Sequence, residues 1–556
     1  MKSHFSILAL LPLLAGLLLS GCRNNDGGPD ERSPYECVDP MIGTGFHGHT
    51  FPGATTPYGA VQLSPDTRSG DWDAAAGYHY SDSALYGFSH THLSGTGCTD
   101  LGDVLLRPTR ESLDRLLTRS DDDRRRSPGD EMHPATFSHK NEHAEPGFYS
   151  VRLDDGIQCD LTATAHCGLH RYAFGTKGEG TPSVVIDLAH LLSADDCISE
   201  MEMEQTAPDE VQGYRITEGW SPDRHIYFVA RFSQPATKMT EGNIRGIMLL
   251  EFGNADTLVV NVGISQVSME GAVRNLEAET GAPSTANFDK TRKATAEVWR
   301  RALEKVAVKG GTRDERTLFY TALYHTMTAP NLVSDADGQY RRADGTIATV
   351  PEGQRRYSTL STWDTFRALH PLLTLTDSAL VSDICYSMLD WYDATGELPI
   401  WPLSSGETKC MIGYHSASII ADAYLKGIWP AAGDATSAKR ALDAMVRSSD
   451  INEKGSDYYI RDGYIPADRK RESVSCLLEY TYDDWCISAM AERMGETAVA
   501  AKYRQRAANY TRCFDGGSRF FRGRRSDGNW SEGFDPYEAG RDYTEATAWQ
   551  YRFGVL

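Results

Sequence analysis

The chain has 556 residues, a formal net charge of -21 and 11 cysteines. So many residues exceed what one hydrophobic core usually holds, and we therefore expect at least two domains. The negative charge would repel a polyanion, which excludes nucleic acid as a partner and favours a neutral or weakly charged substrate. The cysteines form no CxxC pair, so their spacing predicts no disulfide pairing, and thiols in apolar stretches, such as Cys385, are expected to be buried.

The first residues have the pattern of a lipoprotein signal peptide. Lys2 precedes an apolar run over residues 7–19, which ends at Leu19-Ser-Gly-Cys22. The run is short for a membrane span, and a cysteine after a small-residue cleavage site is the lipid acceptor of bacterial lipoproteins. We expect residues 1–21 to be removed, Cys22 to attach the chain to a membrane by lipid, and residues 22–33 to be a flexible tether. The predicted location is the periplasm or the cell surface at the outer membrane; an ordinary secretory signal is the alternative.

A loop rich in glycine and proline follows at residues 39–59. It carries five glycines, three prolines, two histidines and three aromatic residues. Glycine allows positive φ and close backbone approach, whereas proline fixes the chain, so the segment predicts a shaped loop that presents side chains to a small polar ligand.

Short β-rich runs separated by turns extend from there to about residue 271. Several alternate between apolar and polar residues, as half-buried strands do. We predict an N-terminal antiparallel β-sandwich over residues 34–275, with strands at 148–153, 183–187, 226–232, 247–252 and 258–262. Residues 119–130 mix many charges of both signs and predict a solvated loop.

The apolar period changes to that of helices after about residue 287. Long loops that contain tryptophan, histidine, aspartate and proline join these helices, which is typical of an α/α toroid whose loops meet at one mouth. We predict such a domain over residues 285–556, with helical patterns at 318–327, 380–388, 417–427, 437–446, 476–494 and 499–510.

Two kinds of site have weak support. His47 and His49, like His90 and His92, are two residues apart and could be metal ligands on one strand face, but no third ligand occurs at a recognisable spacing. The alternative is that these histidines form hydrogen bonds to the backbone or to ligand hydroxyls. The segment 94–98 contains a serine but no Gly-x-Ser-x-Gly elbow, so tight-turn packing is expected there.

Carbohydrate chemistry has stronger support, because it needs carboxylates flanked by aromatic rings that stack on sugar faces. Three loops of the helical half combine the two: Trp363 with Asp364, Trp401 with Glu407, and Glu545 between Tyr543 and Trp549. One such pair is more often structural than functional. Three of them in one helical domain favour a sugar-binding mouth.

These segments together resemble glycoside hydrolase family 92, bacterial calcium-dependent exo-α-mannosidases. The motifs extend along nearly the whole chain after the tether and include Asp39-Pro-Met-Ile-Gly-Thr-Gly, His47-Gly-His-Thr-Phe-Pro-Gly, Gly87-Phe-Ser-His-Thr-His-Leu-Ser-Gly-Thr-Gly, Ser361-Thr-Trp-Asp-Thr-Phe-Arg, Glu407-Thr-Lys-Cys-Met-Ile-Gly-Tyr-His and Tyr543-Thr-Glu. The resemblance implies a β-sandwich packed on an (α/α)6 toroid, with the active site at their interface.

The resemblance also implies a mechanism and its residues. An acid protonates the glycosidic oxygen while a carboxylate activates water on the other face, so that the anomeric configuration inverts, and calcium binds the sugar hydroxyls. Glu545 matches the general acid, and burial against Tyr543 and Trp549 is expected to favour its protonated form. The terminal mannose pocket is expected to be formed by Phe46, His47, Gly48, Trp363 and Asp364, with Glu407 as a weaker candidate. The expected reaction is release of mannose, α-1,2-linked by preference, from glycans.

Two departures from the family pattern are visible. Ala546 and Thr547 follow Glu545 where the family usually has Gly-Asn. The segments that carry the general base and most calcium ligands have no counterpart in these 556 residues, so we expect an incomplete toroid with uncovered apolar faces, metal ligands that are unknown, and a chain that is catalytically poor by itself. The alternatives are a lipid-anchored mannose-binding or glycan-binding protein without turnover and a different glycosidase on a similar toroid.

Overall fold

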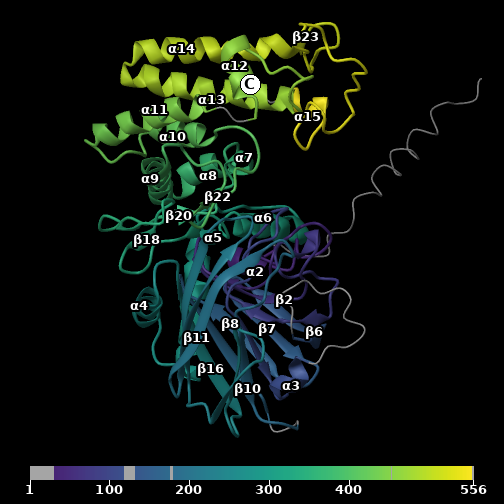
Figure 1. Cartoon of the computed structure of the whole chain (residues 1–556), viewed down its shortest axis with the longest axis vertical. Helices are drawn as coiled ribbons and strands as arrows, with labels where there is room; N and C mark the ends of the chain where they lie inside the picture. Colours follow the sequence, from purple (N-terminus) through teal and green to yellow (C-terminus); the bar gives the residue numbers. More distant parts are fainter. Residues whose placement is uncertain (1–29, 118–131, 176–178, 452–453, 554–556) are drawn as a thin grey trace, which may run out of the picture.

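A computed structural model describes residues 30–117, 132–175, 179–451 and 454–553. The predicted signal peptide, Cys22, most of the tether at 22–33 and the charge-dense stretch at 119–130 lie outside these residues. Within the described ranges, helices long and apolar enough to cross a membrane are absent. The two large β-sheets form one end of the molecule and the helices from α7 to α15 form the other (Figure 1).

Two antiparallel sheets make up the N-terminal half. The first has seven strands in the order β1 (Ala54–Thr55), β2 (Gln62–Asp66), β4 (Gly87–Ser89), β5 (Leu105–Thr109), β10 (Ser183–Asp187), β15 (Ile247–Glu251) and β14 (Lys238–Glu241). The second has nine, in the order β11 (Cys197–Ala207), β12 (Glu210–Glu218), β13 (Arg224–Phe232), β16 (Thr257–Ser265), β9 (Cys167–Ala173), β8 (Gln158–Ala163), β7 (Phe148–Leu153), β6 (Ala135–Glu145) and β3 (Ala84–Leu85).

The core of this sandwich is formed by alternate residues of both sheets. Val184 and Ile186 of β10 are fully buried, as are Leu161 of β8 and Val260 of β16, and all four belong to one hydrophobic cluster. Because successive side chains of a strand point to opposite faces, each strand supplies every second residue to this layer. The predicted antiparallel sandwich and its five predicted strands are confirmed.

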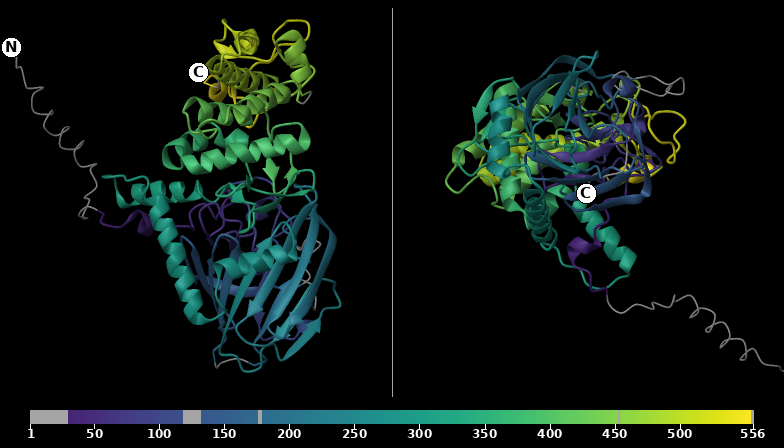
Figure 2. Two further views of the ribbon diagram at one scale, coloured as in Figure 1. Left: turned by 90° about the vertical axis from the view of Figure 1, so that its left-hand side faces the viewer. Right: turned by 90° about the horizontal axis from the view of Figure 1, so that it is seen from below.

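Two helices cover the outer face of the nine-stranded sheet. Ala272 of α4 (Met269–Glu279) and Phe288 of α5 (Thr285–Leu303) pack against Leu169 of β9 and Val259 of β16. Near its end, α5 also places the buried Trp299, whose Nε1–H donates to the carbonyl oxygen of Thr55 at 2.7 Å. The helical period in the sequence therefore begins on the sandwich itself (Figure 2).

A short helix, α3 (Leu113–Leu116), belongs to the sandwich half, whereas the helices from α6 onward stack in layers on one end of the sandwich (Figures 1 and 2). They are α6 (Arg313–His325), α7 (Thr362–Thr365), α8 (Leu369–Thr376), α9 (Ser378–Thr395), α10 (Ser416–Leu425), α11 (Ala435–Ser449), α12 (Ser456–Asp462), α13 (Ser473–Met494), α14 (Thr497–Ala507) and α15 (Ala548–Tyr551). The six predicted helical patterns fall on α6, α9, α10, α11, α13 and α14, and a 3-10 turn, η3 (Ala508–Cys513), follows α14. Large apolar side chains, such as Leu375 and Trp485, are exposed on this half.

The longest of these helices, α13, is central to the packing of this half. Its residues Leu478, Ile487 and Met490 are buried in the same cluster as Ile384 of α9 and Ile420 of α10. It also buries the carboxyl of Asp484, which accepts hydrogen bonds from the Tyr414 hydroxyl at 2.8 Å and from Arg506 Nε at 2.9 Å. Burial raises the pKa of Asp484 to about 6.

Short two-stranded antiparallel sheets lie in the loops between the helices. They pair β17 (Asn331–Leu332) with β20 (Tyr357–Ser358), β18 (Gln339–Arg341) with β19 (Ile347–Thr349), β21 (Pro402–Leu403) with β22 (Gly406–Glu407), and β23 (Phe514–Asp515) with β24 (Phe520–Phe521). Ser221, from the sandwich, donates its hydroxyl hydrogen to the carbonyl oxygen of Leu403 at 2.7 Å. The hairpin β21–β22 thus belongs to the boundary between the two halves.

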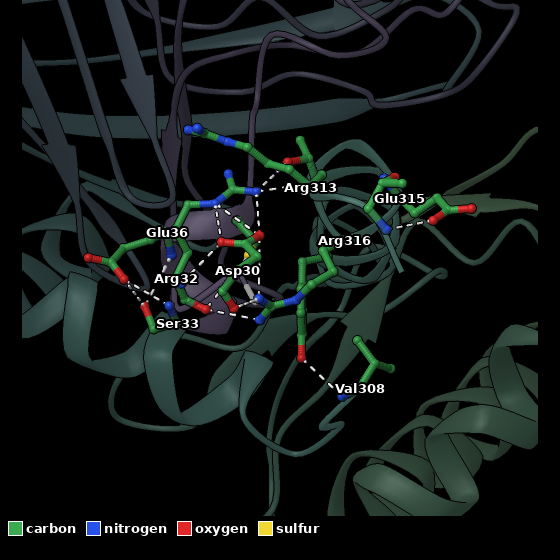
Figure 3. A network of polar contacts seen from close by, with 12 residues as sticks. Asp30, Arg32, Ser33, Glu36, Val308, Arg313, Glu315 and Arg316 are labelled. Carbon is green, nitrogen blue, oxygen red and sulfur yellow. Dashed lines mark hydrogen bonds and ion pairs between the residues drawn. The ribbon is translucent and has the colours of Figure 1, made fainter. Parts of the chain in front are cut away.

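The segment that precedes the sandwich is attached to α6 (Figure 3). Arg316 of α6 donates to the carbonyl oxygen of Arg32 at 2.9 Å and forms an ion pair with Asp30 at 3.3 Å. Ser33 and Glu36 then form a capping box at the start of α2 (Pro34–Cys37). The last residues of the predicted tether therefore contact the folded part of the chain.

Candidate active site

A cavity of about 560 Å³ lies between the sandwich and the helical half. Loops from both halves line it, and they include the predicted residues His47, Trp363, Asp364 and Glu545. Four lining residues that are not glycine have positive φ: His49 at 51°, Thr359 at 59°, Met411 at 66° and Glu545 at 49°. Such strained backbones occur mainly at functional sites, where the surrounding structure holds them in place.

The loop at 39–59 contributes two histidines that share one carboxylate. His47 Nδ1 lies 2.8 Å and His49 Nε2 lies 3.2 Å from Oδ1 of Asp73. The other ring nitrogen of His49 lies 2.7 Å from the carbonyl oxygen of Thr96. The hydrogen bond from His47 lowers the pKa of Asp73. Trp72 packs against both imidazoles, with ring centroids 4.9 and 4.4 Å away, so the two histidines have fixed positions at the cavity wall.

Phe46 and Gly48 take different positions from His47. Phe46 is 82 % exposed and its ring contacts that of His47, but it does not line the cavity. Gly48 lies in a tight turn, where a Cβ would come within 2.2 Å of the carbonyl oxygen of Gly43. Gly48 therefore permits the loop shape that presents His47.

Trp363 and Asp364 belong to the single turn of α7. The hydroxyl of Thr362 donates to the carbonyl oxygen of Ile400 at 2.7 Å, which attaches α7 to the neighbouring loop. Trp363 is half-buried, and its Nε1–H has no acceptor among the described residues. The Asp364 carboxylate is exposed and accepts a hydrogen bond from Ser361. An aromatic ring and an exposed carboxylate thus lie at one cavity, a combination that suits contacts with a sugar face and its hydroxyls.

Glu407 is placed differently from the other predicted residues. Its carboxylate accepts three backbone hydrogen bonds, from the amides of Ile400 and Trp401 at 2.8 Å and of Lys409 at 2.9 Å. Burial raises the pKa of Glu407. It does not line the cavity. Its contacts hold the loop from which Trp401 reaches the cavity.

Glu545 faces the cavity from the last loop before α15. Thr544 N–H donates to Ser475 Oγ at 2.7 Å on one side, and Thr547 caps α15 on the other. The expected burial against Tyr543 and Trp549 is wrong: Glu545 is exposed, Tyr543 is directed into the helical core, and the Trp549 ring packs on Phe520. The side chains on either side of Glu545 serve the packing of α15, so the carboxyl is left at the cavity surface.

The second histidine pair lies in the sandwich core. His90 Nδ1 is 2.7 Å from the carbonyl oxygen of Val104, and His92 Nε2 is 2.7 Å from Oδ1 of Asp66. Both rings are buried, and they do not meet His47 and His49. The interpretation as hydrogen-bonding histidines applies to this pair. The segment 94–98 forms turns at the cavity edge, where Gly95 N–H donates to the carbonyl oxygen of His49 at 2.7 Å.

Several lining residues were not predicted. Trp72 follows the same tryptophan–acid pattern as the predicted loops, and that signal could have found it. Trp220 approaches Trp401, which belongs to the predicted loop with Glu407, from the opposite half, with ring centroids 4.5 Å apart. His325 and His370 also line the cavity, and burial lowers the pKa of each to about 4. Their surroundings are apolar helices, which offer no sequence signal for a site.

One group of side chains among the described residues could hold a metal ion. His47, His49 and Asp73 offer two nitrogens and one oxygen within 4.8 Å of one another. Such a donor set suits a transition metal, whereas calcium takes six or more oxygen ligands. The group therefore does not fit the calcium that the family resemblance implies.

Comparisons with known proteins match this architecture. The model of the glycosyl hydrolase family 92 N-terminal domain matches residues 37–265, and that of the family 92 catalytic domain matches residues 271–556. An uncharacterized secreted glycosidase of Arthroderma benhamiae is 25% identical over 527 residues, which cover 86% of this chain. The chain spans 62% of the length of that relative.

Solved structures are similar over nearly the whole chain. A family GH92 α-mannosidase from Bacteroides thetaiotaomicron in complex with mannoimidazole is 32% identical, covers 94% of this chain and is covered over 71% of its own, with a TM-score of 0.85. An inverting mannosidase of the same family, from Bacteroides thetaiotaomicron VPI-5482, is 27% identical and has a TM-score of 0.80, with 95% of this chain and 71% of that chain covered. The two domain matches and this identity lead to one conclusion: the chain belongs to glycoside hydrolase family 92.

Proposed function

We propose that this chain carries the donor-sugar site of an exo-acting α-mannosidase, which releases terminal mannose from glycans. The observation behind the proposal is the interdomain cavity, where His47, Trp363, Asp364 and Glu545 meet although they lie up to 498 positions apart in the sequence. A cavity with aromatic rings and a few polar groups in its wall suits a sugar residue of a glycan chain. The mannoimidazole complex of a family member supports mannose as the sugar.

In this proposal Glu545 is the general acid. Its strained backbone holds the carboxyl at the cavity surface, where it can donate a proton to the glycosidic oxygen as the bond to the leaving group breaks. Inversion requires a second carboxylate that activates water on the opposite face of the sugar. One relative is named an inverting mannosidase, which supports inversion in this chain's reaction. We assign the base to none of the described residues.

Sugar recognition in this proposal is shared by the two halves. The Trp363 ring offers a stacking surface, while Asp364 accepts hydrogen bonds from hydroxyls. His47 contributes from the sandwich side, supported by Asp73. The preference for α-1,2 linkages and the assistance by calcium are both expectations from the family resemblance. The group of His47, His49 and Asp73 is unsuited to calcium.

The test is mannose release from α-1,2-, α-1,3- and α-1,6-linked mannobiosides, with the anomer of the product followed by NMR. We expect slow turnover, because the base is assigned to none of the described residues, with β-mannose released first and a loss of at least about 100-fold in kcat for Glu545→Gln, the scale of a general acid. Glu538→Gln is the matched control, since Glu538 is an exposed acid of the same loop and does not line the cavity.

Other outcomes would change the proposal. Mannose binding by calorimetry without any hydrolysis would favour a glycan-binding protein, and hydrolysis of glucosides but not mannosides would favour a different glycosidase. Activity of Glu545→Gln equal to that of Glu538→Gln would remove Glu545 from the acid role.

We also propose that lipid on Cys22 holds the protein at the cell envelope, which the N-terminal sequence pattern supports. The secreted glycosidase among its relatives is consistent with a place outside the cytoplasm. Cys22→Ala should abolish palmitate labelling and move the protein from the membrane fraction to the soluble fraction. Unchanged labelling of this variant would contradict the anchor.

A further inference from the structure

His47, His49 and Asp73 form a compact group at the wall of the cavity. Two imidazole nitrogens and one carboxylate oxygen of these side chains all lie within 4.8 Å of one another. Oδ1 of Asp73 is 2.8 Å from Nδ1 of His47 and 3.2 Å from Nε2 of His49. Two ring nitrogens therefore approach the same oxygen atom, and both histidines line the cavity.

The hydrogen bonds of His49 leave its Nε2 without a proton to donate. Its Nδ1 lies 2.7 Å from the carbonyl oxygen of Thr96, which can only accept, so Nδ1 carries the proton. A neutral imidazole has one N–H, and Nε2 consequently presents a lone pair to Oδ1 of Asp73, which is an acceptor as well. Two acceptors at this distance repel each other unless a cation lies between them or the imidazole takes up a second proton. The neutral side chain of His49 therefore needs a cation at this contact.

The contacts around the group resemble those of a metal site. A histidine that binds a metal usually donates its other ring N–H to a carbonyl or carboxylate oxygen, as His49 does to Thr96. The backbone of His49 has a positive φ of 51°, and its side chain is only 4 % exposed, so its ring is held in place. Arg68 approaches the other oxygen of Asp73, Oδ2, at 3.8 Å and leaves Oδ1 to the two histidines.

We propose that His47, His49 and Asp73 bind a divalent transition-metal ion, with Zn²⁺ as the best match. Imidazole and carboxylate donors suit Zn²⁺, and its bonds of about 2.0–2.2 Å place neighbouring ligand atoms of a tetrahedral site roughly 3.3 Å apart. The separations of 2.8 and 3.2 Å at Oδ1 of Asp73 are close to this value. The third ligand lies 24 positions beyond His49, which is why the spacing of the histidines alone did not reveal it.

The proposed site has room for a further ligand of the ion. Three protein ligands leave one position of a tetrahedral site for water or for a hydroxyl group of a molecule in the cavity. The side chain of His47 is 47 % exposed, so solvent reaches the group from that side. The site does not depend on the proposed mannosidase activity and is distinct from the calcium that the family resemblance implies.

Titration of the full chain with Zn²⁺ tests the site. The protein is purified without a histidine tag and freed of metal with EDTA, and calorimetry should then show one tight Zn²⁺ site per chain that excess Ca²⁺ does not occupy. Asp73→Asn should weaken Zn²⁺ binding about 100-fold or more, because loss of an outer partner of a metal ligand already costs 10–100-fold. His225→Ala is the matched control, since His225 and Asp223 form a histidine–aspartate pair at 2.9 Å in the same sandwich but belong to no such group among the described residues.

Two results of this titration would overturn the proposal. One is the absence of Zn²⁺ binding by the unmodified chain, and the other is equal Zn²⁺ affinity of the Asp73→Asn and His225→Ala variants. Folding of Asp73→Asn is checked by circular dichroism and Tm. If this variant does not fold, His47→Asn replaces it, because the side chain of His47 is half exposed, and it should lose Zn²⁺ affinity in the same way.

The visible spectrum of the Co²⁺-loaded chain supplies a second measurement. We expect the d–d bands of Co²⁺ with nitrogen and oxygen ligands, absent in the Asp73→Asn variant and displaced by Zn²⁺. A charge-transfer band from thiolate to Co²⁺ would instead assign the ion to cysteines and would contradict the proposed ligands.

Discussion

At the scale of residues, the wall of the interdomain cavity includes residues with strained backbone and unpaired polar groups. Glu545 and His49 have positive φ, and Trp363 has a buried N–H without an acceptor among the described residues. A folded chain tolerates such costs where neighbouring contacts outweigh them.

Glu407 provides a prediction at this scale. Because its carboxylate accepts three backbone hydrogen bonds, Glu407→Gln should remove part of this charge-assisted bonding and lower the free energy of unfolding by about 1–3 kcal/mol. Urea unfolding measures the loss. Glu397→Gln is the control, since the exposed Glu397 lies 3.7 Å from Lys409 and should matter little. Equal stability of the two variants would contradict the role of Glu407.

Sequence patterns identified the residue types of the site but could not separate their roles. Trp363–Asp364 and Trp401–Glu407 look alike in the sequence, yet Asp364 is exposed at the cavity and Glu407 is occupied by its own loop. The difference depends on which backbone amides converge on each carboxylate. Loop geometry decides that, and the residue pattern does not encode it.

At the scale of elements, the loop at 39–59 positions His47 through its glycines. Gly43 has φ of 92°, and the absence of a side chain at Gly48 lets the backbone at Gly48 approach that at Gly43 closely. A loop of this kind presents a rigid surface at little entropic cost on binding.

We expect Gly48→Ala to displace this loop, because its Cβ would overlap the carbonyl oxygen of Gly43 at 2.2 Å. Mannose binding should weaken about tenfold or more, with a smaller change in Tm, and calorimetry with mannose measures it. Gly45→Ala is the control, since its Cβ would meet only Tyr80 at 3.4 Å. If both variants bind mannose alike, the shape of this turn is not part of the site.

The positions of several strands and helices could be predicted because their apolar residues recur at a regular spacing. The runs at 183–187 and 476–494 became β10 and most of α13. The boundary between the sandwich and the helical half was less predictable from the sequence. The helix α5 has the apolar period of a helix, yet its residues Phe288 and Trp299 pack on the sandwich. An amphipathic face indicates that a helix is covered, but not by which partner.

At the scale of the whole molecule, buried histidines link stability to pH. Burial lowers the pKa of His90, His325 and His370 to about 4, whereas an unfolded histidine titrates near 6.5. The unfolded chain therefore binds more protons between these values. The stability that these groups support is complete above about pH 6.5 and is lost as the pH falls toward 4.

His370→Asn should consequently reduce the loss of stability between pH 6.5 and 4 by about 1–3 kcal/mol relative to the unchanged chain. Denaturant unfolding across this range measures the slope. His143→Asn is the control, because its hydrogen bond with Glu145 raises the pKa of the exposed His143, so this variant should not flatten the profile in the same way. An unchanged slope for His370→Asn would contradict the linkage.

The order of strands and helices, the aromatic–acid loops and the family itself were determined by the sequence alone, because periodicity and motifs are local properties of the chain. The tertiary structure decided which of these loops line the same cavity: His47 with Glu545, and Trp220 with Trp401. These partners lie hundreds of positions apart, and no local preference brings them together. Their meeting follows from the burial of apolar surface between two separately patterned halves, which fixes the cavity and its walls at the same time.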